Sequence, residues 1–176
     1  DPLTARVIVN RLWHHVFGRG IVAPTDNFGK LGDLPTNPEL LDFLAQHFIE
    51  SGGSLKEMLK TLLMSKAFQR GALPSVASAQ KDPENKLLSH WSIRRLEAEA
   101  VRDSILSLSG KLTTDLYGEP DGSSKPRRSI YVKVARNSLD AFLTTFDAPV
   151  PFMSRGKRDM TNVPAQSLAL MNDKRV

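Results

Sequence analysis

Apolar side chains surround almost the whole of the helix predicted for residues 2–17. Residues 7–9 are Val, Ile and Val, and further apolar residues follow, so no face of the helix is obviously made for solvent. Asp1 as N-cap, Pro2 at the first helical position and Gly18 just past the end are typical start and stop residues. The pattern therefore predicts a helix that is central to the fold.

The same helix carries polar side chains that would then lie inside the protein. Buried polar groups need hydrogen-bond partners. We predict a buried polar network built from the first helix and a charged pair further along the chain: Asn10, Arg11, His14, Arg95 and Glu99. Such a network would either stabilise the fold or line a site, and the residues alone do not decide which.

Apolar residues at helical spacing predict further helices over residues 38–51, 55–68, 92–109, 138–146 and 162–171. Asn37 precedes one of these, and Ser54 with Glu57 matches a capping box at the start of another. The expected fold class is mainly α. The chain length suits one helical domain over residues 1–176, with a single core and about five helices, cut from a larger protein.

A minor β element is expected near residues 129–134, where β-branched residues alternate with polar ones. Its strand partner is not identified, with residues 20–23 the candidate. Loops are predicted near residues 71–81, which are small and polar, and near residues 113–128, which are rich in Gly and Pro.

The chain contains no cysteine, which excludes disulfides, thiolate zinc sites, iron–sulfur clusters and covalently attached haem from this segment. No cofactor is expected. No apolar run approaches the roughly 18 residues needed to cross a bilayer, so membrane insertion is not expected.

The net charge of +5 is concentrated in one stretch. Residues 125–158 hold eight Lys and Arg against two Asp, a net charge of +6. Arginine holds sulfate, phosphate or carboxylate with two hydrogen bonds at once, which makes five residues a candidate anion-binding set: Arg127, Arg128, Arg155, Lys157 and Arg158. The alternatives are a solvated face or pairing with the carboxylates of residues 92–109. Nucleic acid is not expected, because aromatic residues are sparse in this stretch.

Histidines and carboxylates are the candidate groups for catalysis. No pair of His residues four apart and no known metal-binding spacing occurs, so no metal site is predicted. Glu99 and Asp103 share a helical face and would serve acid–base chemistry together with His14 or His90. Nearby arginines favour ordinary ion pairs instead, and the residues leave enzymatic activity undecided.

Six segments occur in a specific order: DPLTARVIVNRLWHHVFGRGIV, NPELLDFLAQHFIESGGSLKEMLKTLLMSKAFQR, RRLEAEAVRDSIL, RRSIYV, TTFDAP and RDMTNVPAQSLALMND. Together they resemble the C-terminal domain of unknown function in large cytochrome-c-associated proteins of planctomycetes and related bacteria. The resemblance covers almost the whole chain. It implies an exported, periplasmic or cell-surface, multidomain protein whose haem-binding segment lies elsewhere. Such proteins often accompany sulfatases, which implies a role around complex or sulfated polysaccharides.

The resemblance brings no catalytic residues, because the family has no assigned activity. Many relatives carry a Cys shortly before the segment equivalent to Arg158–Pro164, and this chain has none. We expect an interaction or ligand-binding module, with the flanking domains of the same polypeptide or an anionic glycan as partner. The alternatives are a hydrolytic enzyme domain acting on glycans and a purely structural domain that supports its neighbours.

Overall fold

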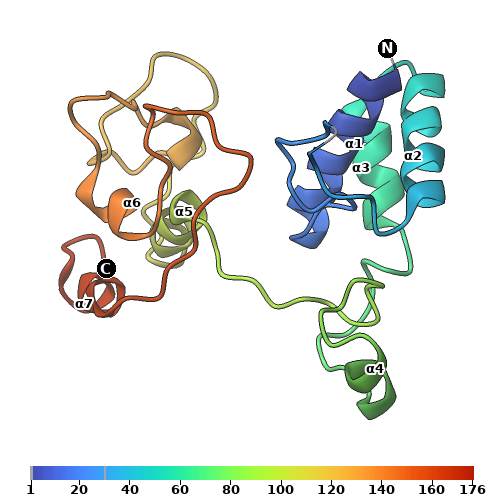
Figure 1. Cartoon of the computed structure of the whole chain (residues 1–176). Coiled ribbons are helices and arrows are strands. Elements are labelled where there is room, and N and C mark those ends of the chain that lie inside the picture. Colours follow the sequence, from blue (N-terminus) through green and yellow to red (C-terminus); the bar gives the residue numbers. More distant parts are fainter. Residues whose placement is uncertain (1, 30) are drawn as a thin grey trace. The chain divides into compact units, whose positions relative to one another are not determined.

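The computed structural model describes residues 2–29 and 31–176, and it is mainly helical as predicted (Figure 1). The chain divides into two compact units, Asp1–Arg94 (the N-terminal unit) and Arg95–Val176 (the C-terminal unit). The single core expected from chain length is divided between two clusters of buried residues, one in each unit. That residues 1–176 form one domain of a longer protein stays a prediction.

The core of the N-terminal unit is built by the helices α1 (Pro2–Phe17), α2 (Pro38–Glu50) and α3 (Leu55–Leu63). They lie side by side, and α1 contacts both of the others (Figure 1). Their apolar faces meet in a cluster of almost fully buried residues that includes Val9, Leu41 and Met58. Burial of this apolar surface is the main force that stabilises the unit.

Helix ends in this unit follow the predicted capping chemistry. The Asn37 side chain accepts a hydrogen bond from the Leu40 N–H at 3.0 Å, and the Ser54 hydroxyl accepts one from the Glu57 N–H at 3.3 Å. Gly18 follows α1 with a φ of +86°, a left-handed conformation that favours glycine. The predicted N-cap Asp1 lies outside the described residues.

The first helix does have a solvent face, contrary to the sequence-based prediction. Leu3, Arg11 and His15 are exposed and lie at multiples of four residues from one another, while Val9 and Asn10 on the opposite side are fully buried. Four-residue steps keep side chains on one side of a helix. A narrow stripe of α1 is therefore exposed, although the apolar run in its sequence does not indicate one.

Two predictions for residues 71–98, a loop and the start of a helix, differ from the structure. Residues within the predicted loop 71–81 form α4 (Val76–Lys81), capped by the Ser75 hydroxyl, which accepts a hydrogen bond from the Ser78 N–H at 3.2 Å. The helix expected from residue 92 begins only at Ala98.

Contacts with the N-terminal unit account for the late start of that helix. The Trp91 ring packs against Phe17 and Phe68, and the Trp91 backbone N–H donates to the Gly71 carbonyl at 2.8 Å. Arg94 donates to the His15 and Val16 carbonyls at 3.0 and 2.9 Å, which are terminal groups of α1 without partners in the helix. Residues 91–94 are thus engaged elsewhere and do not join the helix.

The C-terminal unit contains α5 (Ala98–Leu108), the 3₁₀-helix η1 (Ser129–Tyr131), α6 (Ala141–Thr145) and α7 (Pro164–Asn172). Its buried apolar cluster is small: Ala98, Phe142, Leu143 and Phe146. Long loops connect these elements (Figure 1). In residues 2–29 and 31–176, no helix has the length and apolar character that spanning a membrane requires.

The β element expected near residues 129–134 is reduced to an isolated bridge. Asp121 pairs with this segment, since its N–H donates to the Tyr131 carbonyl and its carbonyl accepts from the Lys133 N–H, both at 2.8 Å. The partner is therefore Asp121 and not residues 20–23. The residues just before the bridge form η1 instead of continuing a strand.

Candidate functional site

A buried arginine on α5 organises the loop that carries much of the positive charge. Arg102 is only 1% exposed. Its guanidinium donates hydrogen bonds to the backbone carbonyls of Ser123, Lys125 and Arg127 at 2.9, 2.6 and 2.8 Å, and to the Ser129 hydroxyl at 3.0 Å. Because the guanidinium offers five N–H donors in a rigid fork, one side chain fixes several carbonyls at once.

Asp103 holds the same loop at its end. Its carboxylate accepts hydrogen bonds from the Ser129 N–H at 2.8 Å and from the Ser129 hydroxyl at 2.6 Å. Burial lowers the pKa of Arg102 from its ordinary value, and the charge of Asp103 opposes that shift. We call Arg102, Asp103 and the loop 123–129 that they hold the arginine clamp.

Arg127, predicted to bind an anion, serves the fold instead. It is buried, and it donates to the carbonyls of Asp115, Tyr117 and Glu119 and to the carboxylate of Asp121. Its guanidinium also lies 4.1 Å from the centre of the Tyr131 ring. With its donors engaged inside the protein, Arg127 is not available to an external ligand.

Two of the other predicted anion-binding residues form ion pairs within the unit. Arg155 pairs with Asp159, and Arg158 lies 3.4 Å from a Glu97 carboxylate oxygen and 2.6 Å from one of Glu99. The alternative interpretation, pairing with carboxylates at the start of α5, therefore describes Arg158.

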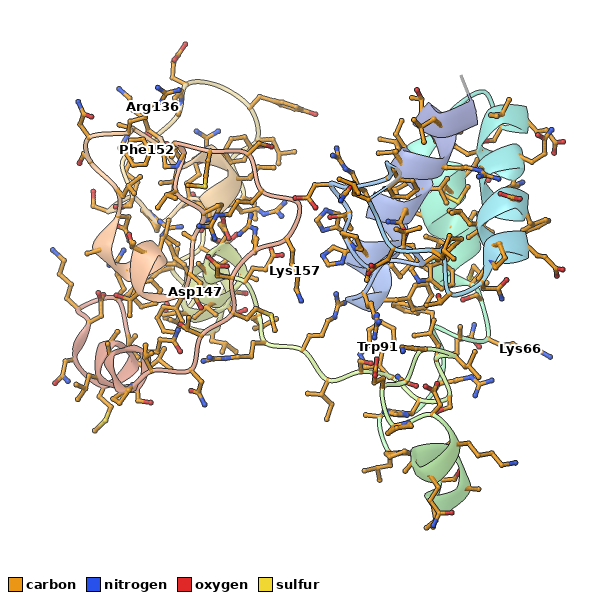
Figure 2. All side chains as sticks on the ribbon, viewed as in Figure 1. Lys66, Trp91, Arg136, Asp147, Phe152 and Lys157 are labelled. Atoms are coloured by element: carbon orange, nitrogen blue, oxygen red, sulfur yellow. The ribbon has the colours of Figure 1, made fainter. Side chains whose placement is uncertain are left out.

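Arg128, Arg155 and Lys157 are the exposed members of the predicted set, and of these Arg155 is paired with Asp159. The Arg128 side chain is 55% exposed, and its Nε lies 4.0 Å from the nearer Asp103 carboxylate oxygen. Lys157, labelled in Figure 2, is exposed and has no ion pair within the part of the chain that is described. No hydrogen bond or ion pair among the described residues joins Arg127 or Arg128 to Arg155, Lys157 or Arg158.

Two further exposed cations follow η1 and were not singled out from the sequence. Lys133 and Arg136 are both exposed, and neither has an ion pair among the described residues; Arg136 is labelled in Figure 2. They lie on the continuation of the segment that the arginine clamp holds. What distinguishes them is that no carboxylate among the described residues forms an ion pair with them, which only the folded structure reveals.

The five residues predicted for a buried polar network do not form one. Asn10 is fully buried and pairs twice with Val22, donating to its carbonyl at 3.0 Å and accepting from its N–H at 2.9 Å. Arg11 is exposed and donates to the Thr25 carbonyl, and His14 is half-buried.

The remaining two members of that predicted network belong to the C-terminal unit. Arg95 is exposed and donates to the Thr161 carbonyl, and Glu99 is half-buried and pairs with Arg158. Long, flexible side chains place their charges at the surface even on partly buried helices, which is the physical reason for the difference.

The groups considered for acid–base catalysis are not brought together within either unit. His14 and His90 belong to the N-terminal unit, whereas Glu99 and Asp103 belong to the C-terminal unit. His90 contacts the Ser89 hydroxyl at 3.1 Å, and Asp103 is engaged by Ser129. In residues 2–29 and 31–176, no three metal-ligating side chains gather in an arrangement that could hold an ion.

A second polar cluster fixes the segment before α7. Asp147 has a φ of +64°, and its carboxylate accepts from the Thr161 N–H at 2.7 Å and from the Thr161 hydroxyl at 2.8 Å. The buried Gln166 side chain donates to the Thr145 carbonyl at 3.1 Å and to the same Thr161 hydroxyl at 3.2 Å. This cluster joins the end of α6 to the start of α7.

The structural role of Arg102 had a sequence signal. Arg102 stands four residues after Ala98 and four before Leu106, both of them buried, and so falls on the apolar side of the helix. An arginine at that position needs acceptors inside the protein. Which carbonyls supply them is not visible locally, because the loop is more than 20 residues away along the chain.

The chain matches a known family over its whole length. Residues 1–176 match the family model described as PSD1, protein of unknown function (DUF1553). No curated protein and no solved structure matches the chain. Because this match extends from residue 1 to residue 176, the chain belongs to the PSD1 (DUF1553) family.

Proposed function

We propose that the C-terminal unit is a ligand-binding module for an anionic glycan, with sulfated polysaccharide as the preferred class. The arginine clamp is the observation that carries the proposal. A flexible cationic loop would lose conformational freedom on binding, whereas a loop already held by Arg102 loses less. The held segment carries Arg128, and Lys133 and Arg136 follow it along the chain.

The cations available to a ligand are those that the unit itself does not use. Within residues 125–158 they are the exposed side chains Lys133, Arg136 and Lys157, together with Arg128, which is exposed although its Nε lies 4.0 Å from an Asp103 carboxylate oxygen. Each exposed pairing contributes at most about 1 kcal/mol, so recognition needs several of them together. A polyanion such as a sulfated glycan supplies repeated charges to match them.

The context proposed for this module rests on the resemblance in sequence. Proteins of the kind that the six segments resemble are exported and often accompany sulfatases, which supports a sulfated polysaccharide as the ligand and a larger exported protein as the setting. The flanking domains of that protein would perform the chemistry, and this unit would hold the substrate close to them. Phe152, exposed and labelled in Figure 2, adds an apolar surface of the kind that sugar rings contact.

The test is retention on immobilised heparin at low salt, where charge attraction is least screened. We expect the intact chain to be retained and to elute as the salt concentration rises. Uncharged dextran should not retain it. A chain that passes through heparin unretained at low salt would refute the proposal.

A matched pair of double variants separates a local site from overall charge. Lys133→Glu with Arg136→Glu is expected to weaken heparin binding about tenfold or more, since two favourable charges become repulsive. Lys56→Glu with Lys60→Glu changes the net charge equally on exposed positions of α3 and should bind nearly as well as the unchanged chain. Equal losses in both variants would show attraction by net charge alone and would overturn the assignment of the site.

A further inference from the structure

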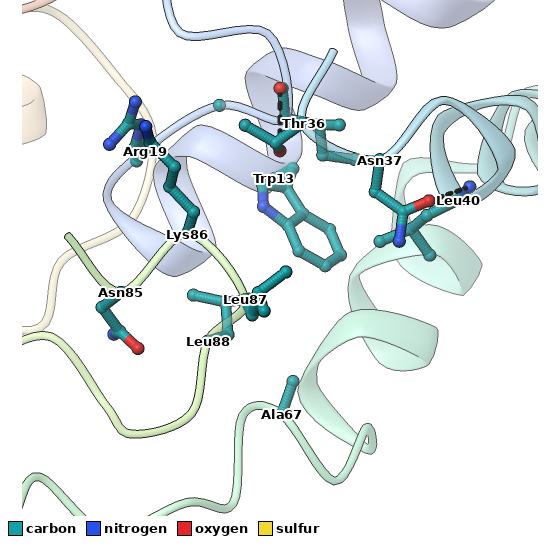
Figure 3. A pocket seen from close by; sticks show the side chains of 12 residues that line it. Trp13, Arg19, Thr36, Asn37, Leu40, Ala67, Asn85, Lys86, Leu87 and Leu88 are labelled. Atoms are coloured by element: carbon teal, nitrogen blue, oxygen red, sulfur yellow. Dashed lines mark hydrogen bonds between the residues drawn. The ribbon is translucent and has the colours of Figure 1, made fainter. Parts of the chain in front are cut away.

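The N-terminal unit contains a pocket that the proposed function does not use. Its volume is about 180 Å³, and apolar side chains make up most of its wall, among them Trp13, Leu40, Ala67, Leu87 and Leu88 (Figure 3). An apolar cavity of about 150 Å³ accommodates a benzene molecule. The pocket is therefore large enough for one ring, and smaller than the roughly 300 Å³ at which sites for larger ligands begin.

Positive charge lies at one end of this pocket. Arg19 and Lys86 line it, and both contact the same Glu84 carboxylate oxygen, at 3.2 and 3.1 Å. Two cations thus share Glu84 as their ion-pair partner, while the nearby Asp82 carboxylate accepts hydrogen bonds from the backbone N–H groups of Lys86 and Leu87 and forms no ion pair with either cation among the described residues. An anionic group at this end would complement the two cations.

Trp13 offers both an apolar face and a polar edge to a ligand. Its indole N–H donates no hydrogen bond to any residue that the structure describes, and Figure 3 shows the nitrogen edge on the side of Arg19 and Lys86. A Trp N–H is a hydrogen-bond donor only. An anionic acceptor that reaches the two cations is thus also suited to the indole N–H.

The wall formed by residues 85–88 is held in place before any ligand binds. Asn85 is buried, and its side-chain amide donates to the His90 carbonyl at 2.8 Å and to the Ser92 hydroxyl at 2.9 Å. On the other side, Gly20 lies against the Asn10 amide, and a Cβ at Gly20 would come within 2.3 Å of the Val22 carbonyl oxygen. A preformed pocket binds a ligand without the entropic cost of ordering a loop.

We propose that this pocket binds a small amphipathic anion, in which a single apolar ring enters against Trp13 and a carboxylate or sulfate stays at the mouth between Arg19 and Lys86. The volume limits the ligand to one ring. The Glu84 carboxylate repels an anion, and the two basic groups on either side of it attract one. This site is separate from the glycan surface of the C-terminal unit, so either proposal can fail alone.

The test uses benzoate as the probe and benzyl alcohol as its uncharged analogue, each titrated through the millimolar range. The two tryptophans of the chain give two indole N–H signals in NMR spectra, and a Trp91→Phe variant assigns them. We expect benzoate to shift the Trp13 signal in a saturable manner, with Trp91 changing little. Benzyl alcohol should bind about threefold more weakly, since it lacks the charge attracted by the mouth.

Exposed positions supply variants that leave the fold intact. Leu87 lines the pocket and is 76% exposed, and Leu87→Asp should weaken benzoate binding about tenfold by removing apolar wall and adding repulsion. Leu73→Asp, at a 90% exposed position of the same unit that does not line the pocket, should have no effect. Lys86→Gln should weaken benzoate binding about threefold, and Lys66→Gln should not (Figure 2).

Three results would overturn the proposal. The first is a Trp13 signal that benzoate leaves unchanged throughout the titration. The second is equal loss of binding in Leu87→Asp and Leu73→Asp, which would place binding elsewhere. The third is equal affinity for benzoate and benzyl alcohol, which would remove the role of the cations at the mouth.

Discussion

The two units of this chain are stabilised by different kinds of interaction. In the N-terminal unit, three helices bury a broad apolar cluster, and a buried polar side chain such as Asn10 is an isolated exception. In the C-terminal unit the apolar cluster is small, and buried Arg102, Arg127 and Gln166 hold loops by hydrogen bonds to backbone carbonyls. Where apolar burial is limited, long polar side chains supply the cohesion and specify the loop shapes.

The largest expected effect comes from removing the arginine clamp. Arg102→Met keeps the apolar stem but removes the donors to four oxygen atoms, and we expect the free energy of unfolding to fall by about 3–5 kcal/mol. Amide hydrogen exchange should show lost protection in η1 and the loop before it. Arg102→Lys, which keeps the charge without the planar fork, should recover only part of the loss.

If Arg102→Met lowered the free energy of unfolding by less than about 0.5 kcal/mol, the contrast between the two units would be wrong. Apolar burial alone would then stabilise the C-terminal unit. Heparin retention of the same variant gives a second readout. If the clamp positions the exposed cations, retention should weaken in Arg102→Met even under conditions where the chain stays folded.

A smaller effect is expected from the polar exception in the N-terminal unit. Asn10→Ala leaves the buried Val22 N–H and carbonyl without partners and should lower the free energy of unfolding by about 1–3 kcal/mol. Arg11→Ala changes the next residue of the same helix at an exposed position and should cost less than about 0.5 kcal/mol. Denaturant titrations of the two variants test this difference, and similar losses would contradict it.

The smallest effect expected here concerns acid stability of the C-terminal unit. Hydrogen bonds from the Arg175 guanidinium lower the pKa of Asp173 from 3.8 to about 2. Because the folded pKa is depressed, the stabilisation is present above about pH 4 and is lost as the pH falls through about 2. After allowance for solvent screening it amounts to about 1 kcal/mol.

Asp173→Asn should therefore flatten the fall in unfolding free energy between about pH 4 and pH 2, measured by denaturant titration at each pH. Asp159→Asn, at a more exposed ion pair with Arg155, is the matched control and should change the slope less. An unchanged slope in Asp173→Asn would show that the Asp173–Arg175 pair does not contribute to the acid stability.

Local chemistry made part of this fold predictable. Caps at Asn37 and Ser54 depend on residues within three positions, and both form as expected. The late start of α5 depends on Trp91 and Arg94, whose partners lie many residues away, so helical spacing alone placed it too early.

The candidate site was predictable in composition but not in detail. The excess of positive charge in residues 125–158 is a property of the sequence, whereas the division into structural and exposed cations is a property of the fold. Arg127 and Arg128 are neighbours of the same type, and one is buried against backbone carbonyls while the other reaches solvent. No local pattern distinguishes them, because the distinction depends on which loop lies over each side chain.

The two hydrogen bonds between Asn10 and Val22 determine which backbone groups another polypeptide could reach. A side-chain amide that both donates and accepts imitates the peptide group of an adjacent strand. In the segment after α1, both backbone groups of Val22 are therefore already occupied. Neither group is open to the backbone of another polypeptide, so Val22 offers no template for intermolecular β-pairing.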